Sequence, residues 1–157
     1  MSKPIQQWLD EYGESHQNKT NKIIHWVCVP QIFWTILAIA YTIPIPTFFA
    51  EISPYLNWAS LSSLFIIAFY ARLSISLTIG MAAFTAFCFF TVVLFDHAFP
   101  GYLLISATVA FILLWIAQFY GHEVEGKKPS FLKDLQYLMI GPAWLMSFIY
   151  NKIGLKY

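Results

Sequence analysis

Three of the four histidines in this chain stand where polar sequence meets long apolar runs. His16 and His25 belong to the stretch ESHQNKTNKIIHW near the N-terminus, and His122 belongs to the segment GHEVEGKKPS. Neutral imidazole is a common ligand of iron, zinc and copper, and three imidazoles leave coordination positions open for a substrate and for dioxygen or water. The sequence therefore suggests a metal centre, whereas the plainer interpretation is that each ring only hydrogen-bonds a lipid headgroup or a helix end.

The spacing of His16 and His25 requires a break between them. On one unbroken α-helix, nine residues turn through about 900°, which leaves the two rings on opposite faces. The intervening sequence supplies the break, because Asn18 or Thr20 is a good N-cap for a second helix. We expect a first helix over residues 4–15 that ends before His16, so that the chain folds back and both imidazoles reach one pocket.

The composition is that of a small integral membrane protein. Of the 157 residues, 59% are hydrophobic and 19% aromatic, while only 11% are charged. A soluble domain of this size could not bury so much apolar surface. The formal net charge of +1 argues against nucleic-acid binding, since recognition of phosphates needs a strongly basic face. The lipid bilayer is therefore the expected surrounding.

Four apolar runs without charged residues are long enough to be transmembrane helices. A helix needs about 20 residues to cross roughly 30 Å of hydrocarbon. The junctions suit helix ends, because proline, serine or glycine stands at two of the three and Arg72 divides the second run from the third. We predict four spans in a single all-α membrane domain over 1–157, at residues 23–43, 55–71, 73–95 and 102–120.

Two shorter apolar segments are expected to be interfacial. The run 135–150 is short for a span and contains Gly141 and Pro142, so we predict a bent helix that is re-entrant or interfacial. The first helix has apolar residues at helical spacing, a stripe that can lie on the membrane surface. That stripe consists of Ile5, Trp8, Leu9 and Tyr12.

The basic residues predict the orientation. With four spans and the N-terminus inside, every Lys and Arg falls on the cytoplasmic side, and the two outer turns hold none. Both termini are then cytoplasmic, as are the polar cap 1–22 and the loop 121–134, which carry the two histidine motifs. The three candidate histidines share one membrane depth. His97, beside Asp96, is expected at the outer end of the third span, about 30 Å away.

The second motif also contains charged side chains. Glu123 or Glu125 could supply the carboxylate of an iron site with two histidines. The alternative is a solvated ion-pair face with Lys127 and Lys128. Those two lysines could instead bind an anionic headgroup or carboxylate, or only reflect the cytoplasmic excess of positive charge.

The two motifs resemble a known family. From Trp8 to about Phe148 the chain is similar to the bacterial branch of the membrane family that includes the yeast Mpo-type 2-hydroxy fatty acid dioxygenase. Many relatives have Pro where this chain has Lys19. The first matching pattern contains Tyr12, His16, Asn18, Asn21, His25 and Pro30, and the second contains Gly121, His122, Glu125, Lys127, Lys128 and Pro129.

This resemblance implies an Fe(II)-dependent α-oxidation, in which a 2-hydroxy fatty acid and O2 give the fatty acid one carbon shorter plus CO2. It also implies that His16, His25 and His122 hold the iron. The residues expected to orient these ligands or contact the substrate are Tyr12, Asn18, Asn21, Glu125, Lys127 and Lys128. The branch resembled suggests the inner membrane of a bacterium, with the site facing the cytoplasm.

Two other functions remain open at this point. A Zn²⁺ ion in the same position would lower the pKa of a bound water and support a membrane lipid hydrolase. A protein without catalysis could use the polar cap to bind a headgroup or a partner protein.

Overall fold

Where the structure describes the chain, it consists of helices and the connections between them. The computed structural model describes residues 4–53, 55–126 and 137–157. Within these ranges every regular element is an α-helix, which confirms the predicted all-α fold for them. The seven helices described are α1 (Ile5–Glu14), α2 (Lys19–Thr42), α3 (Thr47–Ile52), α4 (Trp58–Ala71), α5 (Ile75–Ala98), α6 (Leu103–Glu125) and α8 (Ile140–Ile153).

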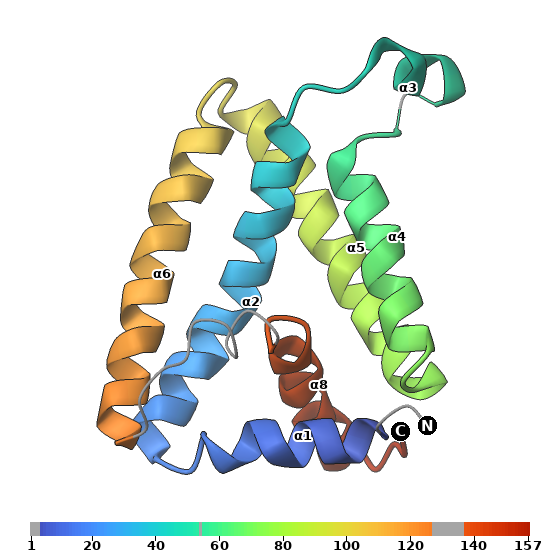
Figure 1. The fold of residues 1–157 in the computed structure, drawn as a ribbon. Coiled ribbons are helices and arrows are strands. Elements are labelled where there is room, and N and C mark those ends of the chain that lie inside the picture. The colour runs from blue at the N-terminus through green and yellow to red at the C-terminus, as the bar shows by residue number, and fades with distance from the viewer. Residues whose placement is uncertain (1–3, 54, 127–136) are drawn as a thin grey trace.

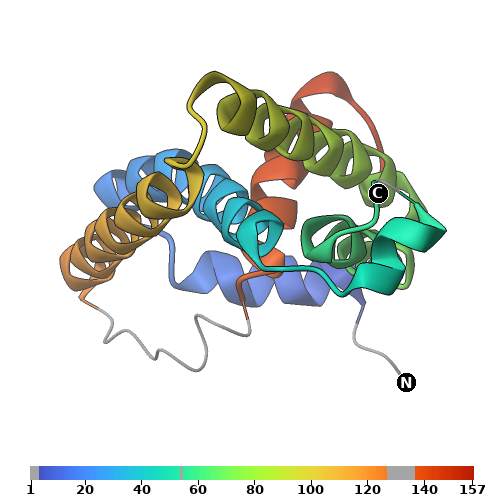
Figure 2. The same cartoon turned by 90° about the horizontal axis from the view of Figure 1, so that it is seen from above.

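Four of these helices carry the chain back and forth between the two ends of the molecule. In Figure 1, α2 rises, α4 descends, α5 rises again and α6 descends. The view from above in Figure 2 places α2 between α6 and the pair formed by α4 and α5, and α2 packs against all three. Helices α1 and α8 lie at the lower end, where α2 begins and α6 finishes.

Three of the four predicted spans have the length and apolar character that a membrane crossing requires: α2, α5 and α6, with 24, 24 and 23 residues. Helix α4 is apolar but has 14 residues, which is about 21 Å at the rise of an α-helix. It begins at Trp58 because Asn57 and Ser60 form a capping box there. The predicted break at Arg72 is confirmed, while the count of four spans stays a prediction.

Large apolar side chains face outward along α5 and α6. A soluble monomer rarely exposes an apolar surface of this extent, whereas hydrocarbon would cover it at no cost. The three long apolar helices and this surface are compatible with a membrane protein. The exposed side chains include Ile75, Ile79, Phe87, Phe90 and Leu94 on α5, and Leu104, Ile105, Val109, Ile112, Leu113 and Ile116 on α6.

The apolar stripe of α1 is covered by protein, which corrects the expectation that it lies on the membrane surface. Ile5, Leu9 and Tyr12 are buried and belong to the main hydrophobic core. The helix that covers them is α8, which lies next to α1 in Figure 1. An apolar stripe shows only that one face of a helix avoids water, and here a second helix satisfies that need.

Pro142 does not interrupt a helix. Helix α8 begins at Ile140, so Pro142 falls in its first turn, where a missing backbone N–H costs no helical hydrogen bond. The first six residues of α8 are all buried. Whether α8 is re-entrant or interfacial stays a prediction.

Helix α8 is fastened to the bundle by tyrosine hydroxyls. The hydroxyl of Tyr150 donates to the carbonyl oxygen of Ser76 at 2.7 Å and accepts from the backbone N–H of Gly80 at 3.1 Å. The Tyr150 hydroxyl thus inserts into the backbone hydrogen-bond ladder of α5. The hydroxyl of Tyr70 on α4 donates to the carbonyl oxygen of Met139, the residue that precedes α8. These bonds fix α8 against the lower ends of α4 and α5.

Candidate metal centre

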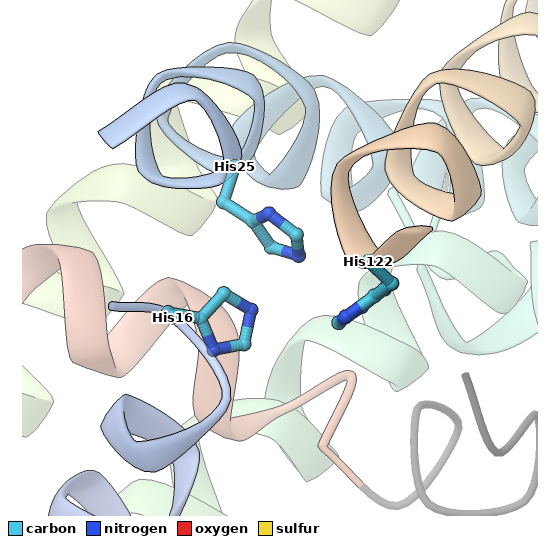
Figure 3. A group of neighbouring side chains, drawn as sticks. All are labelled: His16, His25 and His122. Carbon is cyan, nitrogen blue, oxygen red and sulfur yellow. The ribbon is translucent and has the colours of Figure 1, made fainter. Parts of the chain in front are cut away.

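Three histidines from distant parts of the sequence meet at the lower end of the bundle. His16 lies in the connection between α1 and α2, His25 lies on α2 and His122 lies on α6, and their rings point toward one another (Figure 3). The candidate ligand atoms all lie within 4.8 Å of one another. All three side chains are buried, with exposed fractions of 2%, 1% and 6%. The predicted convergence of these residues is therefore confirmed.

The predicted break between α1 and α2 makes this meeting possible. Helix α1 ends at Glu14, and the side chain of Asn18 caps α2 by accepting from the backbone N–H of Thr20 at 2.8 Å. His16 therefore sits in the turn between the two helices. Its ring centroid lies 4.1 Å from that of His25. Of the two N-cap candidates, Asn18 is the one that the structure uses.

Backbone carbonyl groups orient two of the rings. The Nδ1 atom of His16 lies 2.6 Å from the carbonyl oxygen of Tyr12, and Nδ1 of His25 lies 3.0 Å from that of Asn21. A carbonyl oxygen can only accept, so each Nδ1 carries the hydrogen and each Nε2 carries the lone pair. Metal-binding histidines are usually held in this way. Both rings are therefore prepared to bind a metal through Nε2.

Aromatic rings hold His16 in place. The ring of Tyr12 stacks on that of His16 with a centroid separation of 4.2 Å and an angle of 13°. The ring centroid of Trp144 on α8 lies 5.4 Å from that of His16 and 5.3 Å from that of Tyr12. Sequence reasoning did not find Trp144, because a tryptophan within an apolar run carries no signal that separates it from ordinary core.

The carboxylate of Glu125 binds the turn that carries His16. It accepts from the backbone N–H groups of Gln17 at 2.8 Å and Asn18 at 2.9 Å, and from the side-chain amide of Asn21 at 3.0 Å. Three N–H donors stabilise an ionised carboxylate strongly. Glu125 thus contacts the first histidine motif and does not belong to the three-residue group of candidate ligands.

Helix α6 extends further than the sequence predicts. It was expected to end at residue 120, yet it continues through Glu125 and stops where Gly126 adopts a left-handed conformation with φ of 73°. The segment expected to be a loop from residue 121 is therefore helical at its start. At Gly121 the Asn21 side chain of α2 lies very close to α6. A Cβ atom added at position 121 would lie 2.5 Å from Asn21 Oδ1.

Other candidates lie elsewhere. His97 is in the last turn of α5, exposed, at the end of the bundle opposite the three histidines (Figure 1). Glu123 is exposed on α6, which fits a solvated carboxylate. Lys127 and Lys128 lie outside the described residues.

The donor set fits a bound metal. Three buried imidazoles, two of them with Nε2 as the ligand atom, are a set that Fe(II) and Zn(II) both accept. They occupy no more than half of an octahedral coordination sphere, so positions remain for other ligands. The buried group of His16, His25 and His122 could therefore bind a metal.

Over the described residues, fold and site together define an all-helical protein with three helices long and apolar enough to cross a membrane and a buried three-histidine group at one end. The chain belongs to the Mpo1-like family, since the family model described as 2-hydroxy-palmitic acid dioxygenase Mpo1-like matches residues 2–153. The family resemblance of the two motifs is thus confirmed. Comparison with curated proteins and with solved structures gives no significant match.

Proposed function

We propose that this protein is an Fe(II)-dependent dioxygenase that performs α-oxidation of 2-hydroxy fatty acids. The family description supports the substrate class and the type of reaction. The observation that carries the proposal is the meeting of three buried imidazoles whose candidate ligand atoms lie within 4.8 Å of one another. Such a group holds a metal and leaves room for two further partners, which an oxygenase requires.

The proposed reaction needs no external reductant. A 2-hydroxy acid and O2 give the acid one carbon shorter, CO2 and water, and atoms and electrons balance between these five species. The bond between the carboxyl carbon and the hydroxyl-bearing carbon breaks, and that second carbon is oxidised to the new carboxyl group. Bound iron supplies the redox chemistry with O2, which no side chain of the described residues can provide.

The protein residues hold and enclose the reactants. His16, His25 and His122 would hold the metal, and the rings of Tyr12 and Trp144 pack against that of His16 and restrict its rotation. Burial of the histidines excludes water from the reacting centre. A 2-hydroxy acid can bind a metal through its hydroxyl and carboxylate together, which fixes the bond that must break. We assign the countercharge for the carboxylate to Lys127 or Lys128.

We place the site at the cytoplasmic leaflet of a bacterial inner membrane. The distribution of Lys and Arg supports this orientation. The acyl chain would then extend from the histidines toward the hydrocarbon region between the spans, and the polar head of the substrate would stay at the membrane surface.

The test is a product assay with purified protein in detergent. Iron-loaded protein is given 2-hydroxypalmitate and O2, and we expect pentadecanoic acid and CO2 in equal amounts, with one O2 consumed for each. His122→Ala should abolish product, while His97→Ala should retain it. If the iron-loaded protein consumes no O2 with 2-hydroxy acids of any chain length, the proposed function is wrong.

A further inference from the structure

We propose that Glu125 is a positioning residue that fastens the turn carrying His16 to the helix carrying His122. Its importance for catalysis rests on the proposed function, but the fastening itself does not. Glu125 lies one helical turn after His122 on α6. Its carboxylate accepts hydrogen bonds that link this helix end to the connection between α1 and α2.

The turn contributes two backbone donors that no helix satisfies. The N–H groups of Gln17 and Asn18 precede α2 and follow α1, so neither lies within a helical hydrogen-bond ladder. Both donate to Glu125, one to each carboxylate oxygen. Because these bonds involve a charged acceptor, they are stronger than bonds between neutral groups. The turn is therefore held against α6 directly on the C-terminal side of His16.

Asn21 extends the link to His25. Its side-chain amide donates to Glu125 Oε2 at 3.0 Å and to the carbonyl oxygen of Ser15 at 3.1 Å. Its own carbonyl oxygen receives the Nδ1 hydrogen of His25. The Glu125 carboxylate thus fixes the backbone that follows His16. It also binds Asn21, the residue whose carbonyl group orients His25.

Packing between the described helices gives this turn little other support against α6. Helix α1 packs mainly on α8, not on α6. Without Glu125, His16 would stay near Tyr12 and Trp144, but its distance from His122 would no longer be fixed. We therefore expect removal of the carboxylate to weaken metal binding without unfolding the bundle.

The first test is hydrogen exchange in the metal-free protein. In the wild-type protein the backbone amides of Gln17 and Asn18 should exchange slowly, and Glu125→Ala should make both exchange much faster. The matched control is Glu123→Ala, which removes an exposed carboxylate from the same helical turn and should leave both amides protected. Equal exchange in the unchanged protein and Glu125→Ala would overturn the proposal.

The second test measures Co²⁺ binding from its visible absorption spectrum. Glu125→Ala should weaken binding by about 10- to 100-fold, as loss of a residue that orients metal ligands commonly does. Glu123→Ala should stay within about twofold of the unchanged protein. Glu125→Gln keeps one acceptor oxygen and should give an intermediate affinity, which provides a measurement if the alanine variant folds poorly.

The two tests separate this proposal from the proposed function. Faster exchange with unchanged Co²⁺ affinity would show that Glu125 holds the turn but does not position the ligands, which contradicts the positioning role. If the unchanged protein binds no Co²⁺, the metal-dependent function fails, and hydrogen exchange alone then decides whether Glu125 fastens the turn.

Discussion

Gly121 lies so close to Asn21 that a Cβ atom at position 121 would stand 2.5 Å from Asn21 Oδ1. Real Cβ atoms do not make contacts this short, so any other residue at position 121 would have to displace the Asn21 side chain. The approach brings His122, the next residue on α6, toward His25. It also brings Glu125 within reach of the Asn21 amide. The glycine therefore leaves room for the Asn21 side chain between the two helices that carry most of the site.

Gly121→Ala is predicted to disturb both packing and metal binding. The added methyl group must displace Asn21, and overpacking of this kind typically costs about 1–3 kcal/mol of stability. Co²⁺ affinity should fall as well, because Asn21 orients His25. Thermal unfolding and a Co²⁺ titration check this. A more stable protein, the usual result of Gly→Ala at an uncrowded helix position, would show that the two helices are not in close contact.

Each of the three histidines is predicted to be necessary for metal binding. Replacing His16, His25 or His122 by Ala should lower Fe²⁺ or Co²⁺ affinity by more than about 100-fold, a larger effect than the loss of a residue that only orients a ligand. His97→Ala is the matched control and should bind metal normally, because it lies at the opposite end of the bundle. Unchanged affinity in any of the three variants would remove that residue from the ligand set.

Tyr150→Phe is predicted to loosen α8 from α5 while sparing the histidines. The variant loses the hydrogen bonds to Ser76 and Gly80, but the α5 backbone can restore its own bond, so we expect a loss of about 1 kcal/mol. Unfolding in detergent measures this, with the exposed Tyr120→Phe as the control. An equal effect of both variants would mean that the Tyr150 hydroxyl does not anchor α8.

The orientation predicts which residues a membrane-impermeant thiol reagent reaches. In a background with Cys28 and Cys88 replaced by Ala, single cysteines at Lys19 and Glu123 should be labelled from the cytoplasmic side. A cysteine at His97 should be labelled from the other side. Inside-out and right-side-out vesicles provide the comparison. Labelling of positions 19 and 123 from opposite sides would contradict the topology.

The long helices were predictable because their signals are local. Unbroken apolar runs define α2, α5 and α6, and Arg72 marks the break before α5. The cap at Asn18 follows from the same kind of local rule. The convergence of the three histidines does not follow from local signals alone. It was predicted by assuming that successive spans alternate in direction across the membrane, which places residues from both ends of the chain on the same side.

The contacts that orient the site were not predictable in this way. The stripe on α1 carries no indication that α8 rather than lipid would cover it. The resemblance implies that Glu125 orients ligands or contacts the substrate, but nothing in the sequence indicates that its partners are the backbone N–H groups of Gln17 and Asn18. Trp144 resembles its apolar neighbours. Each of these roles depends on packing between elements that are distant in the sequence.

The most direct test of the central claim is X-ray absorption spectroscopy at the iron edge, on protein purified without oxygen. We expect one Fe(II) per chain, with the scattering pattern of three imidazole ligands, and loss of that signal in His122→Ala. Zinc in place of iron would instead favour hydrolysis. Iron without imidazole scattering, or protein that retains no metal, would contradict the claim that these three histidines form an iron centre.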